Sequence, residues 1–303
     1  MVKIDVITGF LGSGKTTFIK KVLELGYFQN EKLILIENEF GEIAIDGSLF
    51  ADEDLQVYEI SKGCICCSLK GEFIETLERI IKAYQPKQIL IEPSGIFVIE
   101  DLFDILKQPQ IADKCYLNGI HTIVDTKYYR ESKMRYSKFF HSQISAANNL
   151  ILSKCDDYHE HEITKTIKGL KEDNPKANVF SIPFKSLTNE DLKIIFEHRT
   201  HIQNPRHEEG VESHHAEYDI QSMGIQTVSK MTIEQFEGLM DTLRSGKVGY
   251  VIRLKGYLIV DDKHYCVNYA YGDYSLDEVS KKAEPQVSII GDHMDKSKLA
   301  MLF

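Results

Sequence analysis

Short runs of apolar residues recur along the first two thirds of the chain, and stretches with helical spacing separate them. Runs of this length and composition are typical of strands that are buried on both faces. They lie at residues 3–8, 33–36, 55–60, 88–91, 120–124, 150–152 and near 179. Between them, apolar residues recur three and four positions apart, as on the buried face of a helix. These helical stretches cover residues 15–25, 69–84, 97–107, 137–147 and 160–172.

Strands that alternate with helices predict an α/β fold with a doubly wound, mostly parallel sheet. In such a sheet, ligands bind at the carboxyl ends of the strands. The segments that follow the predicted strands are therefore the first places to look for chemistry.

The alternation stops at residues 198–219, which we interpret as a linker. Five of the eleven histidines fall there among Glu, Asn, Pro and Gly. They are His198, His201, His207, His214 and His215. The chain then divides into an α/β domain at 1–197, the linker, and a smaller α+β domain at 220–303.

The smaller domain has its own pattern. Strands are expected at 225–228, 251–260, 264–271 and 287–290. Thr232 and Gln235 have the spacing of a capping box, which marks the start of a helix. The apolar stripe of that helix is Phe236, Leu239, Met240 and Leu243.

Composition narrows the class of protein. The net charge of −10 argues against a nucleic-acid partner, because phosphate backbones attract basic surfaces. No apolar run approaches the roughly 18 residues of a membrane span, and no signal-peptide pattern is present. We therefore expect a cytoplasmic protein without a membrane partner, as a monomer or weak homo-oligomer. Six cysteines in such a protein favour metal or redox chemistry over disulfides.

The segment after the first strand matches the P-loop pattern G-x-x-x-x-G-K-S/T at every fixed position. Its glycines let successive N–H groups point at phosphate oxygens. Lys15 can reach the β- and γ-phosphates, and the Thr16 hydroxyl can bind Mg²⁺. The expected nucleotide-binding residues are Gly9, Gly12, Ser13, Gly14, Lys15, Thr16 and Thr17. The sequence therefore predicts a nucleoside triphosphate with Mg²⁺.

A second candidate follows the strand at 88–91. Glu92 and Gly95 have the spacing of a D-x-x-G switch. Glu92 can hold Mg²⁺ directly or through water, and Gly95 can donate its N–H to the γ-phosphate. The alternative is an ordinary turn, but its position after a strand that should neighbour the P-loop favours the switch.

A third candidate, residues 153–156, resembles the guanine-reading motif N/T-K-x-D. The Asp156 carboxylate can accept hydrogen bonds from guanine N1–H and the 2-amino group, whereas adenine offers no such pair. The Lys154 stem can pack along the base. Ser153 departs from the usual Asn or Thr, although its hydroxyl can still serve. This favours GTP over ATP, against the alternative of a plain loop.

Three cysteines lie within four positions, at Cys64, Cys66 and Cys67. Thiolates at this density bind Zn²⁺, Co²⁺, Ni²⁺ or Cu⁺, and three leave one tetrahedral position open. A redox pair or small buried residues are the alternatives. The isolated cysteines, which we interpret as core or incidental, are Cys115, Cys155 and Cys266.

Carboxylates also follow the second strand. We place Glu39 in the catalytic set, and Glu37 and Glu42 among possible ligands of a transported metal. The alternative is a solvated acidic loop. Asp125, at the end of a later strand, can contact the site or cap the helix that follows.

Taken together, these motifs resemble the CobW-type family of P-loop GTPases, in the same broad class as the nickel-insertion GTPases for urease and hydrogenase. The resemblance rests on GFLGSGKTT at 9–17, ENEFGE at 37–42, GCICCS at 63–68, EPSG at 92–95 and SKCD at 153–156. Residues 251–256 also look like part of the family's second domain.

The resemblance implies a GTP-dependent metallochaperone or metalloprotein activator. Its cysteine cluster would carry zinc, or else cobalt, to a client metalloprotein or a metal-cofactor pathway. The catalytic set would be Lys15, Thr16, Glu39, Glu92 and Gly95. The linker histidines are scattered, unlike the long His-rich runs of some relatives, so we do not expect them to store metal.

Two other functions use the same motifs. A P-loop small-molecule kinase would need a pocket for a phosphate acceptor. A nucleotide-gated binding module would use the cysteines as a structural metal site. Metal binding that responds to the nucleotide would distinguish the chaperone from both.

Overall fold

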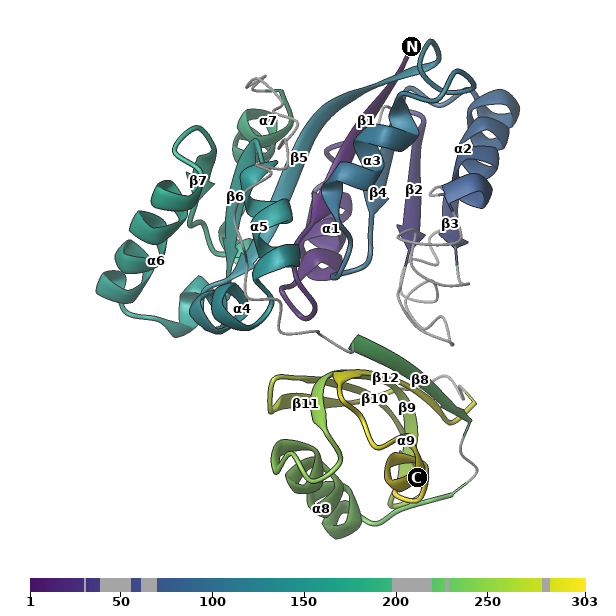
Figure 1. Ribbon diagram of the computed structural model, residues 1–303, viewed down its shortest axis with the longest axis vertical. Coiled ribbons are helices and arrows are strands. Elements are labelled where there is room, and N and C mark those ends of the chain that lie inside the picture. Colours follow the sequence, from purple (N-terminus) through teal and green to yellow (C-terminus); the bar gives the residue numbers. More distant parts are fainter. Residues whose placement is uncertain (30, 39–55, 61–69, 198–219, 227–228, 280–283) are drawn as a thin grey trace. The chain divides into compact units, whose positions relative to one another are not determined.

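The computed structural model describes residues 1–303 apart from 30, 39–55, 61–69, 198–219, 227–228 and 280–283 (Figure 1). Several of the residues for which the sequence predicts a role therefore lie outside the described ranges. They are Glu39, Glu42, the cluster Cys64, Cys66 and Cys67, the linker histidines, and residues 227–228. The described elements belong to two compact units. We call them the sheet unit, up to residue 197, and the C-terminal unit, from residue 220.

The sheet unit is built on seven parallel strands in the order β3-β2-β4-β1-β5-β6-β7. Their bounds are β1 Val2–Thr8, β2 Leu33–Asn38, β3 Gln56–Ile60, β4 Gln88–Glu92, β5 Cys115–Asp125, β6 Asn149–Ser153 and β7 Asn178–Phe180. The predicted doubly wound sheet is confirmed. Because β1 is central, the P-loop lies at the carboxyl edge with β4 and β5 on either side.

Helices connect these strands. They are α1 Lys15–Glu24, α2 Lys70–Tyr84, α3 Ile99–Leu106, α4 Tyr129–Arg135, α5 Ser137–Ser145, α6 Glu160–Asp173 and α7 Asn189–Glu197, with 3-10 turns η2 Cys155–Asp157 and η3 Phe184–Ser186. The sequence patterns missed α4 and α7. In α4 only Tyr129 and Ser132 are buried, so it has no apolar stripe. None of the helices in the described ranges is long and apolar enough to cross a membrane.

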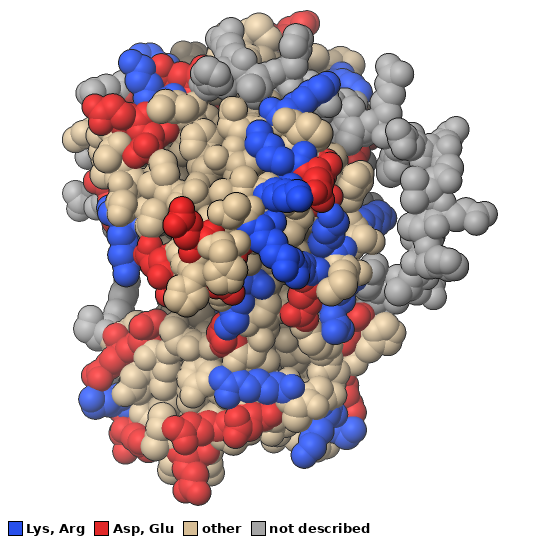
Figure 2. All heavy atoms as spheres, turned by 90° about the vertical axis from the view of Figure 1, so that its left-hand side faces the viewer, with Lys and Arg blue, Asp and Glu red and all other residues tan. Residues whose placement is uncertain are grey.

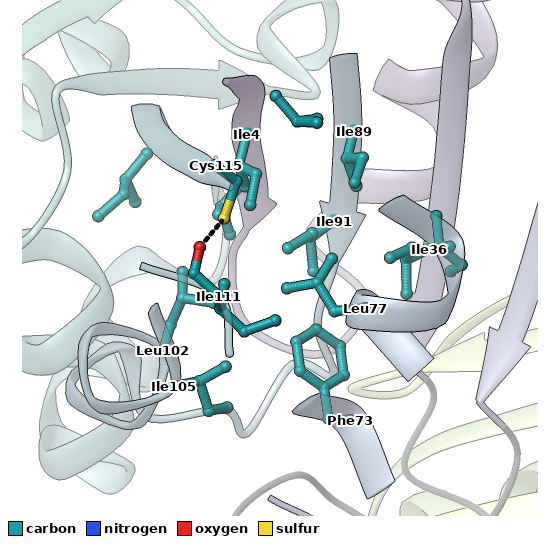
Figure 3. Packing of buried hydrophobic residues seen from close by; sticks show 14 of the residues in the cluster. Ile4, Ile36, Phe73, Leu77, Ile89, Ile91, Leu102, Ile105, Ile111 and Cys115 are labelled. Atoms are coloured by element: carbon teal, nitrogen blue, oxygen red, sulfur yellow. Dashed lines mark hydrogen bonds between the residues drawn. The ribbon is translucent and has the colours of Figure 1, made fainter. Parts of the chain in front are cut away.

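One face of the sheet is an apolar core. Ile4, Ile36 and Ile91, from three neighbouring strands, belong to one cluster with Phe73 and Leu77 of α2, and all five are at most 1% exposed (Figure 3). Helix α3 packs in the same cluster. Alternate residues of each strand project to one face, so every second position on these strands must be apolar.

The opposite face contains a buried polar network. Asp5 in β1 is fully buried and accepts hydrogen bonds from Gln88 (2.7 Å), Asn118 (2.8 Å) and His121 Nε2 (3.0 Å). The other ring nitrogen of His121 lies 2.9 Å from the Asn149 amide. The Asn118 and Asn149 amides also donate to backbone carbonyls in the last turn of α7. The network therefore fixes α7 to the sheet.

The C-terminal unit is an antiparallel sheet in the order β11-β10-β9-β12-β8, with α8 and α9 packed into one core against it (Figure 1). Its elements are β8 Ile220–Gln226, α8 Ile233–Arg244, β9 Tyr250–Val260, β10 Lys263–Ala270, β11 Asp273–Glu278, β12 Gln286–Asp292 and α9 Lys296–Ala300. The predicted capping box is confirmed: Gln235 N–H donates to Thr232 Oγ1 (3.2 Å), and Thr232 N–H to Gln235 Oε1 (2.8 Å). Strand β11 was missed because this edge strand is mostly exposed and polar.

Asp5→Asn should destabilise the fold by about 3 kcal/mol or more, because an amide group replaces an acceptor that faces three buried donors. Urea unfolding followed by circular dichroism measures this change. The control is Asp113→Ala at an exposed position, expected within about 0.5 kcal/mol of the parent. Equal midpoints for Asp5→Asn and the parent would contradict the importance of the network.

Candidate nucleotide and metal site

The P-loop joins β1 to α1 and is shaped for anion binding. Gly9, Gly12 and Gly14 have positive φ angles, and Gly14 (φ 98°) forms the N-cap of α1. Lys15 is buried, and its Nζ donates to the carbonyls of Gly9 (2.9 Å) and Phe10 (3.2 Å). Its ammonium group therefore lies over the same loop whose N–H groups are expected to bind phosphate.

The switch-like segment after β4 packs directly on the P-loop. A Cβ atom on Gly95 would lie 2.4 Å from the backbone nitrogen of Leu11, so only glycine allows this approach. Gln143 of α5 donates to the carbonyls of Gly95 (3.0 Å) and Phe97 (3.1 Å) and is 1% exposed. Gln143 thus positions the segment, although the sequence analysis did not identify it.

The other side of the P-loop is tied to β6 and α5. Ser153 Oγ donates to the carbonyl of Ser13 (2.6 Å). The ring of Tyr136, which precedes α5, stacks on Phe10 with centroids 4.7 Å apart. The Ser153 hydroxyl, expected at the guanine base, here bonds to the P-loop backbone instead.

Thr16 and Glu92, both expected at Mg²⁺, are brought together. Thr16 Oγ1 donates to Glu92 Oε1 (3.0 Å), and Glu92 pairs in register with Glu37 of β2. Both carboxyl residues are buried, at 9% and 6% exposure. Adjacent buried carboxylates repel each other unless a cation or a proton lies between them. Hydroxyl and carboxylate oxygens are also the ligands that Mg²⁺ prefers, so these residues fit Mg²⁺.

Polar groups in the loop also fit a phosphate ligand. The buried hydroxyls of Thr8 and Ser13 have no hydrogen-bond partner within the described part of the chain. Buried hydroxyls are normally hydrogen-bonded, so phosphate oxygens would complete the site. Thr17 lies on the first turn of α1 with its side chain exposed.

The base-reading candidate lies at the end of β6. Lys154 has a positive φ (57°), and its Nζ donates to Asp125 Oδ2 (2.6 Å). The other oxygen of Asp125 accepts the N–H groups of Lys127 (2.9 Å) and Tyr128 (3.3 Å). Asp125 therefore orders the turn before α4 and also holds Lys154. Asp156 is exposed on η2.

Phe184 packs beside the P-loop, at a position that no sequence motif marks. It begins η3, after β7, and its ring packs on Phe18 of α1 with centroids 5.4 Å apart. A Cβ atom on Gly14 would lie 3.7 Å from the same ring. Its position could still have marked it in the sequence, because Phe184 follows the carboxyl end of a predicted strand, where ligands bind.

The expected metal cluster lies outside the described residues, and the described ranges contain no group of three or more His, Cys, Asp or Glu able to hold a metal ion. The segment with the cysteines follows β3, whose last residue Ile60 pairs with Asn38 at the end of β2. Cys115 and Cys155 are buried and free, as interpreted from the sequence. Burial raises the pKa of the Cys115 thiol to about 11 and also raises that of Cys155, so both are poor metal ligands.

Comparison with known proteins gives consistent matches. The family model described as "CobW/HypB/UreG, nucleotide-binding domain" matches residues 3–181. The zinc chaperone YeiR of Escherichia coli (strain K12) is 35% identical over 156 residues, which are 52% of this chain and 47% of YeiR. The chain thus spans about half the length of this relative.

Two further relatives match over most of the chain. The zinc chaperone YjiA of Escherichia coli (strain K12) is 27% identical over 279 residues, covering 86% of this chain and 82% of YjiA. The zinc-regulated GTPase metalloprotein activator 1 of Dictyostelium discoideum is 26% identical over 305 residues, covering 84% of this chain and 62% of that protein.

Gly95→Ala should weaken nucleotide binding at least about tenfold, because the added methyl group must displace the Leu11 backbone and distort the P-loop. Titration of a fluorescent guanine nucleotide measures the affinity. The control is Gly71→Ala, where a Cβ meets nothing within 4 Å. Unchanged affinity in Gly95→Ala, with the control also unchanged, would show that this contact does not shape the site.

Proposed function

The chain belongs to the CobW/HypB/UreG family of nucleotide-binding proteins, and we propose that it is a GTP-hydrolysing zinc chaperone that delivers zinc to a client metalloprotein. The relatives named as zinc chaperones and as a zinc-regulated GTPase support this function. We also propose that residues 1–197 act as the GTPase domain, 198–219 as the linker and 220–303 as a separate domain.

One structural observation carries the proposal. Thr16 in α1 bonds to Glu92, and Glu92 is the register neighbour of Glu37. Glu37 in turn is the register neighbour of Glu59 in β3, the strand that leads into Cys64, Cys66 and Cys67. Adjacent strands thus connect the expected Mg²⁺ ligands with the start of the segment that carries the thiols.

We assign the following roles to the chain's own groups, with Glu39 assigned from the sequence alone. Lys15 would exchange its bonds to the loop carbonyls for bonds to the β- and γ-phosphates. Thr16 and Glu92 would hold Mg²⁺, which when bound neutralises charge that develops on the phosphates. The Gly95 N–H would donate to the γ-phosphate, and Glu39 would orient the attacking water.

Hydrolysis should be slow in the absence of metal or client, because no arginine finger can be identified in the sequence. GTP binding would reshape the segments after β2 and β4, and the cysteine segment lies between them along the chain. If GTP tightens zinc binding, zinc must tighten GTP binding by the same factor. Zinc release would then follow hydrolysis.

Glu37 and Glu42 would assist the thiolates in binding the transported metal. Cobalt is the second candidate for that metal, after zinc.

Asp156→Asn should lower affinity for GTP by about a hundredfold and raise affinity for xanthosine triphosphate. The Asn amide can donate to the 2-oxo group of xanthine, whereas it leaves the guanine 2-amino group without an acceptor. Competition against a fluorescent nucleotide measures both affinities, with exposed Asp157 replaced by Asn as the control. Equal loss for both nucleotides would contradict a base-reading role.

Cys66→Ser should abolish the effect of zinc on GTP hydrolysis while the fold is retained, because one thiolate ligand is lost. Phosphate release with and without zinc measures the effect. Cys115→Ser serves as the control, since the Cys115 thiol is buried and has a raised pKa. It should keep the zinc response, and thermal unfolding of both variants verifies that they fold.

Other results of these experiments would support a different function. A Cys66→Ser variant that unfolds would indicate a structural metal site. Transfer of phosphate to a metabolite, in place of water, would indicate a kinase. A turnover of many per second without zinc or client would contradict the chaperone.

A further inference from the structure

The outer face of α4 combines positive charge with an exposed apolar side chain. Residues 127–138 contain five Lys or Arg and a single acidic residue, in a chain of net charge −10. On the face of the sheet unit that carries α6, Lys and Arg side chains gather into a band (Figure 2). The Lys133–Asp173 ion pair joins α4 to α6.

Helical spacing places three of these residues together. Arg130, Lys133 and Met134 are three and four positions apart, so they share one side of α4. Tyr129 and Ser132 face the core instead. Met134 is 77% exposed, and Lys138 is exposed on the first turn of α5. We call Arg130, Lys133, Met134 and Lys138 the α4 face.

We propose that the α4 face docks an acidic segment of a partner protein that also presents one apolar side chain. Charge complementarity argues for an acidic partner, since opposite potentials steer association. Met134 argues for an apolar contact, because flexible methionine side chains adapt to binding partners. The identity of that partner as the zinc client rests on the proposed function, whereas the docking itself does not.

The chain that leads into α4 shares a carboxylate with the base-reading candidate. The Asp125 carboxylate that holds Lys154 also accepts N–H groups of Lys127 and Tyr128, directly before α4. A partner that shifts α4 therefore acts on the same carboxylate that positions the base-reading lysine. Docking should change the rate at which guanine nucleotide dissociates.

The test uses a fluorescein-labelled peptide of Glu and Asp with a central Leu, titrated against the full chain at low ionic strength. Arg130→Glu combined with Lys138→Glu should weaken binding about tenfold, and Met134→Ser about fivefold. The controls on α7 are Lys193→Glu, a single reversal of an exposed cation, and Ile194→Ser at an exposed apolar residue. They should leave binding unchanged.

Several results would overturn the docking site. One is a loss of peptide affinity in the α7 controls as large as in the α4 variants. Another is binding of a single-stranded DNA of the same charge as tightly as the peptide. The third is self-association of the chain that Arg130→Glu with Lys138→Glu removes. Peptide binding that leaves release of labelled GDP unchanged would overturn the link through Asp125. GTP hydrolysis and zinc binding of the parent, measured without peptide, test the proposed function separately.

Discussion

The backbone of the P-loop lies against the segment after β4 so closely that a single methyl group on Gly95 would meet Leu11 at 2.4 Å. This contact fixes the position of the P-loop backbone relative to the segment after β4, at the carboxyl edge of the sheet. Gln143 supports it from α5, and Ser153 fixes the opposite side of the loop. Because the segment after β4 and the end of β6 hold the P-loop from opposite sides, the loop and the segment at residues 153–156 have a defined geometry relative to each other.

The two faces of the sheet differ in polarity: one is apolar, and the other carries buried polar groups. Strand side chains on the α2 and α3 face are apolar and supply the core. The face toward α1 and α7 carries the Asp5 network and, at the carboxyl edge, Glu37 and Glu92. Buried carboxylates there need donors or cations nearby. For Asp5 the protein supplies three donors. Glu92 accepts from Thr16, and the oxygen atoms of this pair suit a bound metal ion.

The sequence predicted those features whose chemistry demands particular residues at a fixed spacing. The P-loop, Glu92 with Gly95, and Lys154 with Asp156 are candidates of this kind. Strands buried on both faces predict the sheet, which the structure confirms. Gln143 could not be predicted, because its partner Gly95 is 48 residues away and nothing local marks the contact. Asp5 and His121 likewise look like polar interruptions of strands until the fold brings them together. Helix α4 lacks an apolar stripe because only Tyr129 and Ser132 of this helix are buried.

The central claim is that the nucleotide and metal sites are energetically coupled. The most direct measurement is a competition titration of Zn²⁺ against a chromophoric chelator, with Mg-GDP and with a non-hydrolysable Mg-GTP analogue. The account predicts a zinc affinity that differs at least about tenfold between the two, or about 1.4 kcal/mol of coupling. Zinc bound with one-to-one stoichiometry and equal affinity in both nucleotide states would contradict it.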